Sequence, residues 1–379
     1  MKRKKSGSYR SRNIVTKEFD KVLFALTVIL SIIGIVIIYS ATRTTGSNTN
    51  VIVQSAAFLI GLGAMLFLCF FDYEQFGNAV AYIYIFAVAI LIIVLVFGTA
   101  GDWGARGWIR FGSIGIQPAE LAKICFILTF SYHLSKVDER INDIKVLLGL
   151  VLHLGVLLFL IMLEPDLGSA LVFMFMFACM LFVAKISYKY VFAVLGLGAL
   201  SLPLIYKFVL SNYQRQRINV FFDPAIDPLG DGYNVIQSKI AVGAGQLWGR
   251  GYLQGTQNQM GYLPTKSTDF IFSVFSEEFG FVGAILIVCM LFWLIFRCFN
   301  AAKKSDNSYG RYIATGVGAM LLFHVFENVG MCIGLMPVTG IPLPFISYGG
   351  TSIVTNMVAI GLVLSVVYHN KPRVRVDVY

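Results

Sequence analysis

A single carboxylate, Asp269, stands where a polar stretch gives way to a long apolar run, in the sequence LPTKSTDFIFSVFSEEFG of residues 263–280. At helical spacing, Ser273, Ser276 and Gly280 follow it at i+4, i+7 and i+11, so a small and polar stripe lines an otherwise apolar helix. Such a carboxylate could accept a proton in a reaction, and it could equally cap the helix that follows. The spacing leaves both possibilities open.

A second set of charges, Glu120 and Lys123, lies in QPAELAKICFIL, where Pro118 suits the first turn of a helix. Residues three apart share one helical face, so these two side chains can pair. A charge at mid-membrane costs about 2.5 to 3.5 kcal/mol on insertion scales, hence neither is expected to face lipid. A structural ion pair and a direct part in catalysis remain equally compatible with this placement.

Aromatic and cationic side chains gather in residues 98–118, where Trp103 and Trp108 are flanked by Arg106 and Arg110. Tryptophans and arginines of this kind anchor membrane proteins at the lipid–water interface, and the pattern favours that role. The same side chains could instead form a headgroup platform, with ring faces against a sugar and guanidinium groups on phosphate oxygens.

Two acidic residues, Glu164 and Asp166, bracket Pro165 between two apolar runs, which predicts a tight helical hairpin. Capping of the next helix explains Asp166. Glu164 has no such role and is a candidate member of an acidic cluster.

Late in the chain, His324, Glu327 and Asn328 share one helical face before the sequence MPVTGIPLPFISYGGTS. The prolines and glycines between residues 337 and 350 exclude a continuous helix there. Non-helical backbone at membrane depth must be buried in protein or line a cavity. We therefore expect a re-entrant or capping segment over a site.

The elements that position these residues belong to an all-α polytopic membrane protein. Of its 379 residues, 57% are hydrophobic and 13% are charged, whereas soluble domains carry about 25% charged residues. Crossing a hydrocarbon core of ~30 Å takes about 20 apolar residues, and ten segments are candidates, the least apolar being the one with Glu120 and Lys123. The predicted spans are 22–40, 52–71, 80–97, 119–134, 146–163, 167–184, 190–209, 270–296, 312–334 and 351–368.

The charge distribution orients the chain. The basic N-terminus, residues 1–21, runs into the first span without a small-x-small cleavage site, so it is predicted to stay in the cytoplasm. Lys and Arg are then more numerous on the cytoplasmic side, which also places the tail, residues 369–379, inside. The ten-helix domain, residues 22–368, carries a large extracytoplasmic loop at 210–268 between helices 7 and 8. A loop of that length is commonly functional, so the active face is expected outside.

Several classes of partner and cofactor are not indicated. The net charge of +10 is explained by membrane orientation and contact with anionic lipids, so no nucleic acid is expected. The six cysteines show no CxxC spacing and the four histidines no HExxH spacing, so no metal centre is predicted. No cofactor is indicated, and a divalent cation is left open.

Six motifs together resemble those of the SEDS proteins, the shape, elongation, division and sporulation group, over nearly the whole chain. They are GARGWIRFG (104–112), QPAELAK (117–123), EPDLGSAL (164–171), QRQRINVFFDP (214–224), KSTDFIFSVFSEEFG (266–280) and TGIPLPFISYGG (339–350). MPVTGIPLP at 336–344 resembles the RodA branch, because FtsW relatives tend to carry a lysine in the place of Thr339. That favours elongation over division, with FtsW-like and sporulation paralogues as alternatives.

The resemblance implies a ten-helix peptidoglycan glycosyltransferase that polymerises lipid II outside the bacterial cytoplasmic membrane, during elongation and shape maintenance. It also implies a complex with a class B penicillin-binding protein, a transpeptidase, among other membrane proteins of the elongation machinery. Carried residue by residue, the family's essential acidic position falls on Asp269 and its conserved ion pair on Glu120 and Lys123. Trp108 is a further functional candidate.

The implied reaction suits these residue types. A sugar hydroxyl loses a proton as it attacks the donor's anomeric carbon, and Asp269 could accept that proton. The leaving lipid diphosphate needs cationic stabilisation. The candidate cations are Lys123, Arg106, Arg110, Arg215 and Arg217. Since lipid II is α-linked and the product β-linked, one inverting displacement with a single general base suffices.

Two other functions fit part of the pattern. A transporter or lipid II flippase would also carry charges inside its bundle and broken helices, although no internal repeat is evident. A scaffold that only recruits a partner enzyme leaves Asp269, Glu120 and Lys123 unexplained. Polymerisation is therefore the prediction, and the flippase is the alternative.

Overall fold

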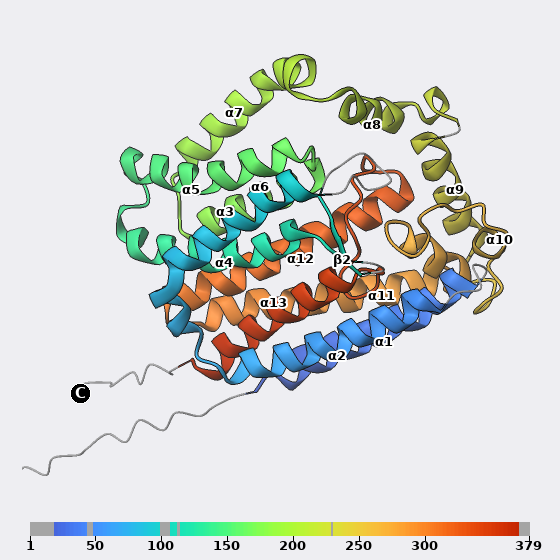
Figure 1. The fold of residues 1–379 in the computed structure, drawn as a ribbon, viewed down its shortest axis with the longest axis horizontal. Coiled ribbons are helices and arrows are strands. Elements are labelled where there is room, and N and C mark those ends of the chain that lie inside the picture. Colours follow the sequence, from blue (N-terminus) through green and yellow to red (C-terminus); the bar gives the residue numbers. More distant parts are fainter. Residues whose placement is uncertain (1–18, 44–47, 99–106, 112–113, 229, 371–379) are drawn as a thin grey trace, which may run out of the picture.

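The computed structural model describes residues 19–43, 48–98, 107–111, 114–228 and 230–370, which form an almost entirely helical domain (Figure 1). Ten helices coincide with the ten predicted segments, which confirms the all-α fold class. They are α1 (Lys21–Thr42), α2 (Thr49–Phe70), α3 (Val80–Phe97), α4 (Pro118–Val137), α5 (Ile144–Leu163), α6 (Leu167–Val183), α7 (Tyr188–Leu204), α11 (Ile271–Lys304), α12 (Ser308–Ile333) and α13 (Gly350–Tyr368).

Within the described part of the chain, seven of these helices are long and apolar enough to cross a membrane. The other three differ for physical reasons. α6 and α7 have only 17 residues each. α7 contains Pro203 and passes directly into the π-helical turn η4 (Ile205–Val209). α4 carries Glu120 and Lys123, but it is buried along most of its length, so these charges meet protein rather than lipid.

The centre of the bundle is formed by α12 and α13. Their apolar stretches are 72% and 67% buried, against 17% for the stretch that contains α3. α13 packs along α2, and α12 packs against α11, α6 and α4. Figure 1 shows α1 and α2 together along one side of the molecule, with α11 and α13 beside them. Polar residues on α12 therefore face the protein interior.

The segment of residues 210–268 is folded into short helices: α8 (Asn212–Phe222), the 3-10 turn η5 (Pro224–Ile226), α9 (Asp231–Ala244) and α10 (Thr256–Gln259). A small antiparallel hairpin of β1 (Ile109–Phe111) and β2 (Ile114–Ile116) precedes α4. Two further 3-10 turns, η2 (Tyr73–Ala79) and η3 (Asp138–Arg140), lie before α3 and after α4. α9 packs against both α11 and α12, at the end of the bundle where α11 begins.

α11 is broken at Gly280, whose φ of 67° lies in the left-handed region. A break inside a membrane leaves backbone groups that need partners, and the chain at residues 246–251 supplies four of them. Phe281 N and Val282 N donate to the carbonyls of residues 246 and 247, while the carbonyls of residues 277 and 278 accept from Arg250 N and Gly251 N. This loop therefore satisfies backbone groups that the break leaves unpaired, and the same hydrogen bonds fix the loop to α11.

Two buried glutamates attach the rest of the segment. The Glu277 carboxylate accepts hydrogen bonds from the backbone N of Gln257 (2.8 Å) and of Asn258 (3.2 Å). Glu278 accepts from the hydroxyl of Ser40 on α1 and from the side-chain amide of Asn258. The chain that leads to Asp269 is thus held to α1 and α11.

Candidate active site

Asp269 lies on the loop that leads into α11 and not on the helix. The helix begins at Ile271, its N-cap position is Phe270, and no side chain caps it. Capping, the alternative use of this carboxylate, is therefore excluded. The predicted stripe continues as buried Ser273, whose hydroxyl lies 2.6 Å from that of Ser238 on α9.

The backbone at Asp269 is held by three hydrogen bonds. Tyr348 N donates to the carbonyl of residue 267 at 2.8 Å, and Ser347 Oγ donates to that of residue 268 at 2.7 Å. Asn328 Nδ2 donates to the carbonyl of Asp269 itself at 2.8 Å. Three consecutive peptide units are therefore fixed by α12 and by the chain between α12 and α13.

The Asp269 carboxylate accepts no hydrogen bond within the described residues. Its Oδ2 faces Gly340, where an added Cβ would lie 3.8 Å away. The side chain keeps part of its surface exposed, but the protein around it is dense, and this burial raises its pKa to about 6 while the Arg217 guanidinium on α8 opposes the rise. Such a group is mostly ionised at neutral pH and basic enough to take a proton.

The chain between α12 and α13 is non-helical, as its prolines and glycines predict, and it approaches Asp269. Phe345 is held at φ 67°, which is costly for a residue with a side chain. Gly34 of α1 packs on its carbonyl so closely that a Cβ there would lie 2.3 Å from the oxygen. Gln54 of α2 donates to Ser347 O (3.2 Å) and accepts from Gly349 N (3.0 Å). Contacts from α1 and α2 thus hold the strained segment in place.

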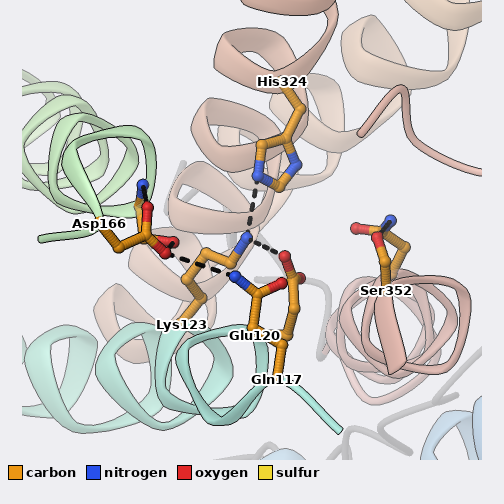
Figure 2. Close-up of polar contacts among 8 residues, drawn as sticks. Gln117, Glu120, Lys123, Asp166, His324 and Ser352 are labelled. Atoms are coloured by element: carbon orange, nitrogen blue, oxygen red, sulfur yellow. Dashed lines mark hydrogen bonds and ion pairs between the residues drawn. The ribbon is translucent and has the colours of Figure 1, made fainter. Parts of the chain in front are cut away.

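Glu120 and Lys123 form a buried ion pair, with 2.8 Å between Glu120 Oε1 and Lys123 Nζ and side-chain exposures of 3% and 2% (Figure 2). Lys123 Nζ also lies 3.0 Å from His324 Nε2 on α12. Because an ammonium group can only donate, His324 Nε2 is the acceptor and its proton sits on Nδ1. Both charges of the pair lie inside the bundle, as their cost in lipid requires.

Not every polar atom of this cluster is used. Glu120 Oε2 and His324 Nδ1 form no hydrogen bond within the described residues. Figure 2 shows Ser352 of α13 across from Glu120, and Gln117 reaching Asp166 at 3.3 Å. Both atoms are buried, so each missing hydrogen bond costs free energy.

One face of α12 connects the ion pair to Asp269. His324 contacts Lys123, and Asn328, one turn on, holds the Asp269 carbonyl. Between them Glu327 Oε1 accepts from the hydroxyl of Thr339 at 2.9 Å. The helix therefore sets the distance between the two charged sites.

The predicted arginines separate into different surroundings. Arg217 acts on Asp269, whereas Arg215 donates to two backbone carbonyls before α8, those of Leu210 and Lys207, both at 3.0 Å. Arg110 is exposed on β1. Arg106 lies outside the described residues. Of the four candidate cations among the described residues, Arg217 is the one whose charge acts on Asp269, and Lys123 is committed to its own pair.

The remaining predicted residues lie near the start of α4. Trp108 precedes β1 and packs on Gly115, where an added Cβ would lie 2.9 Å from its ring. Asp166 caps α6 through Ser169 N (2.9 Å), as predicted. Glu164 is fully buried and neither carboxyl oxygen has a hydrogen bond within the described residues. Burial, with Asp166 adding to it, raises the pKa of Glu164 to about 8.

Sequence reasoning noticed His324 and Asn328 on one helical face but gave them no role, and it missed Ser347 and Gln54. The i, i+3, i+4 spacing was a usable signal for the α12 residues. Ser347 and its partner carbonyl are 79 positions apart, so no local pattern points to that contact. Within the described residues no three His, Cys, Asp or Glu side chains gather as a metal site.

The sequence of this chain is similar to a known protein family and to named relatives. A family model described as "Cell cycle protein", which covers FtsW, RodA and SpoVE, matches residues 20–372. Peptidoglycan glycosyltransferase MrdB of Escherichia coli K12 is 33% identical over 355 residues, covering 93% of this chain and 94% of the relative. A probable peptidoglycan glycosyltransferase FtsW of Geobacter metallireducens is 34% identical over 359 residues, covering 92% and 95%.

Two solved structures are also similar to this chain. A chain from a study of how a peptidoglycan synthase complex coordinates polymerization and crosslinking superposes with a TM-score of 0.77 at 32% identity, covering 92% of this chain and 97% of that one. The crystal structure of the rod shape determining protein RodA of Thermus thermophilus gives a TM-score of 0.70 at 28% identity, covering 95% and 100%.

Proposed function

The chain belongs to the family of FtsW, RodA and SpoVE proteins, and from that membership we propose that Asp269 is the general base of its reaction. The protein is a peptidoglycan glycosyltransferase, the activity for which its relatives MrdB, RodA and FtsW are named. Its proposed substrate is lipid II, a disaccharide carried on a lipid diphosphate. The observation that carries the proposal is a carboxylate on a clamped backbone whose side chain has no hydrogen-bond donor within the described residues.

The proposed step balances as a single displacement. The acceptor's sugar hydroxyl oxygen forms a bond to the anomeric carbon of the donor, and the bond from that carbon to the diphosphate oxygen breaks. The hydroxyl proton passes to an oxygen of Asp269, and the lipid diphosphate leaves with the electron pair. The anomeric configuration inverts because attack and departure occur on opposite faces.

Cations near Asp269 support the departure of the diphosphate. Arg217 already acts on the Asp269 carboxylate, and we assign it to stabilise the negative charge that develops on the diphosphate. Lys123 is neutralised by Glu120, which supports a positioning role for the pair in the first instance. Arg215 is engaged by backbone carbonyls and is assigned to the structure of α8.

We place the enzyme in elongation because Thr339 occupies the position where FtsW relatives tend to carry lysine. Identity does not separate the branches, since MrdB at 33% and FtsW at 34% are equally similar. Thr339 contacts Glu327 beside the Asp269 clamp, so the branch-specific residue lies at the site. The structural similarity to a complex of polymerization and crosslinking supports a class B penicillin-binding protein as partner.

The proposed topology puts both termini in the cytoplasm and residues 210–268 outside. Basic residues support it: Arg297, Lys303, Lys304 and Arg311 lie around the connection between α11 and α12. Asp269 then lies at the outer boundary, where the sugar of a lipid-linked donor is presented.

The test is polymerisation of detergent-solubilised lipid II by purified protein carrying Asp269→Asn. Asparagine keeps the size of the side chain but cannot accept the proton, so glycan synthesis is expected to fall by about 10² to 10⁴ while folding and lipid II binding survive. Soluble substrate removes any need for transport, and a flippase forms no glycosidic bonds, so under that alternative neither the wild-type nor the variant protein makes glycan strands in this assay. Near wild-type strand formation would remove Asp269 from the mechanism. Addition of a chelator to the same assay tests the divalent cation that the sequence leaves open.

A further inference from the structure

Asn328 lies on α12, where this helix meets the Asp269 loop and the segment of residues 339–341. Its side chain forms hydrogen bonds to both of them. It is fully buried on α12. Its side-chain amide donates one hydrogen bond to the carbonyl of Asp269 and one to the carbonyl of Ile341, both at 2.8 Å. A single amide group therefore uses its two hydrogens to hold two separate loops at a fixed spacing.

That spacing bears on the reacting carboxylate. Ile341 follows Gly340, the residue that faces Asp269 Oδ2. The amide thus holds the backbone of Asp269 and the wall opposite its side chain at the same time. The neighbouring Glu327 holds Thr339 of that wall but makes no hydrogen bond to the Asp269 loop within the described residues.

We propose that Asn328 is a positioning residue, whose amide fixes the Asp269 loop against residues 339–341 and so holds the carboxylate where the acceptor hydroxyl loses its proton. This rests on the proposed role of Asp269 as base. Misplacement of a reacting group by about 1 Å can cost ~10²-fold in rate, so a residue that touches no substrate can still govern kcat.

The first variant is Asn328→Asp, which keeps the shape of the side chain but turns a carboxyl group toward two carbonyl oxygens. We expect kcat to fall by about 10²-fold with KM for lipid II little changed, because positioning and not binding is lost. Asn328→Ala serves if the aspartate variant does not fold. Thr315→Val is the matched control, since Thr315 is buried on the same helix and, among the described residues, its hydroxyl bonds only to Arg311 O, at 2.8 Å; we expect its kcat to be unchanged.

A double variant separates positioning from general stability. If Asn328 acts only through Asp269, adding Asn328→Ala to Asp269→Asn lowers the residual rate by no more than about twofold, since the positioned base is already absent. Losses that multiply, or an Asn328→Asp enzyme with wild-type kcat, would overturn the proposal. Full activity of Asp269→Asn alone would instead reject the general base, which is a different failure.

Discussion

The Asp269 loop and the Glu120–Lys123 pair differ in which part of each residue the protein holds. At Asp269 the backbone is fixed and the carboxylate, partly exposed, accepts no hydrogen bond within the described residues. At the pair the side chains hold each other at 2.8 Å and are almost completely buried. A proton acceptor needs a fixed frame and an available side chain, whereas a buried ion pair uses its charges on its own partners. The contrast supports chemistry at Asp269 and architecture at the pair.

The largest effect expected in the comparison comes from breaking the pair. Glu120→Ala or Lys123→Ala leaves one buried charge without its opposite charge, which costs about 3 to 5 kcal/mol, so folded yield and activity should both collapse. The double apolar variant Glu120→Leu, Lys123→Met removes both charges and should recover most of the activity. Chromatographic monodispersity and lipid II polymerisation measure the two properties. A double variant that is folded but inactive would give Lys123 a direct contact with substrate and erase the contrast.

A smaller effect is expected at Glu164, a third acid that is neither clamped nor paired within the described residues. Its pKa of about 8 when folded exceeds the usual 4.5, so the folded state binds more protons and loses stability as pH rises between those values. Glu164→Gln is always neutral and escapes that loss. We expect it to be more stable than wild type by about 1 to 3 kcal/mol at pH 8 and nearly equal at pH 5, with activity retained.

Thermal melts of the Glu164→Gln and wild-type proteins at the two pH values measure this difference. Asp166→Asn is a useful companion, because it removes the neighbouring charge but keeps a side chain able to cap α6. A Glu164→Gln protein destabilised equally at both pH values would mean that Glu164 is ionised and paired in the folded protein.

The sequence predicted the ten helical segments well because their signal is composition over about 20 residues, and that signal survives any tertiary context. It also predicted the Glu120–Lys123 pairing, since i, i+3 spacing on a helix is local. The role of Asp269 could not be settled in the same way. Whether Asp269 caps α11 depends on where the helix begins. In the structure the helix begins at Ile271, two residues after Asp269.

The clamp around Asp269 lay beyond sequence reasoning for a different reason. Ser347 and Asn328 reach the loop from positions 79 and 59 residues away. The prolines of residues 337–344 predicted a break in helix but not which loop it would contact. Likewise Arg215 and Arg217 look equivalent in sequence. In the structure the charge of Arg217 acts on Asp269, whereas Arg215 donates hydrogen bonds to backbone carbonyls.

The pH dependence of kcat/KM for lipid II polymerisation tests the central claim most directly. With Asp269 as base, kcat/KM should be level above about pH 7 and fall as the pH drops through about 6, as the carboxylate becomes protonated. Arg217→Gln removes the charge that opposes this protonation, so the fall should begin at a higher pH, whereas Arg215→Gln on the same helix should leave it in place. A wild-type kcat/KM that stays level from pH 8 to pH 5 would contradict the assignment of Asp269 as the general base.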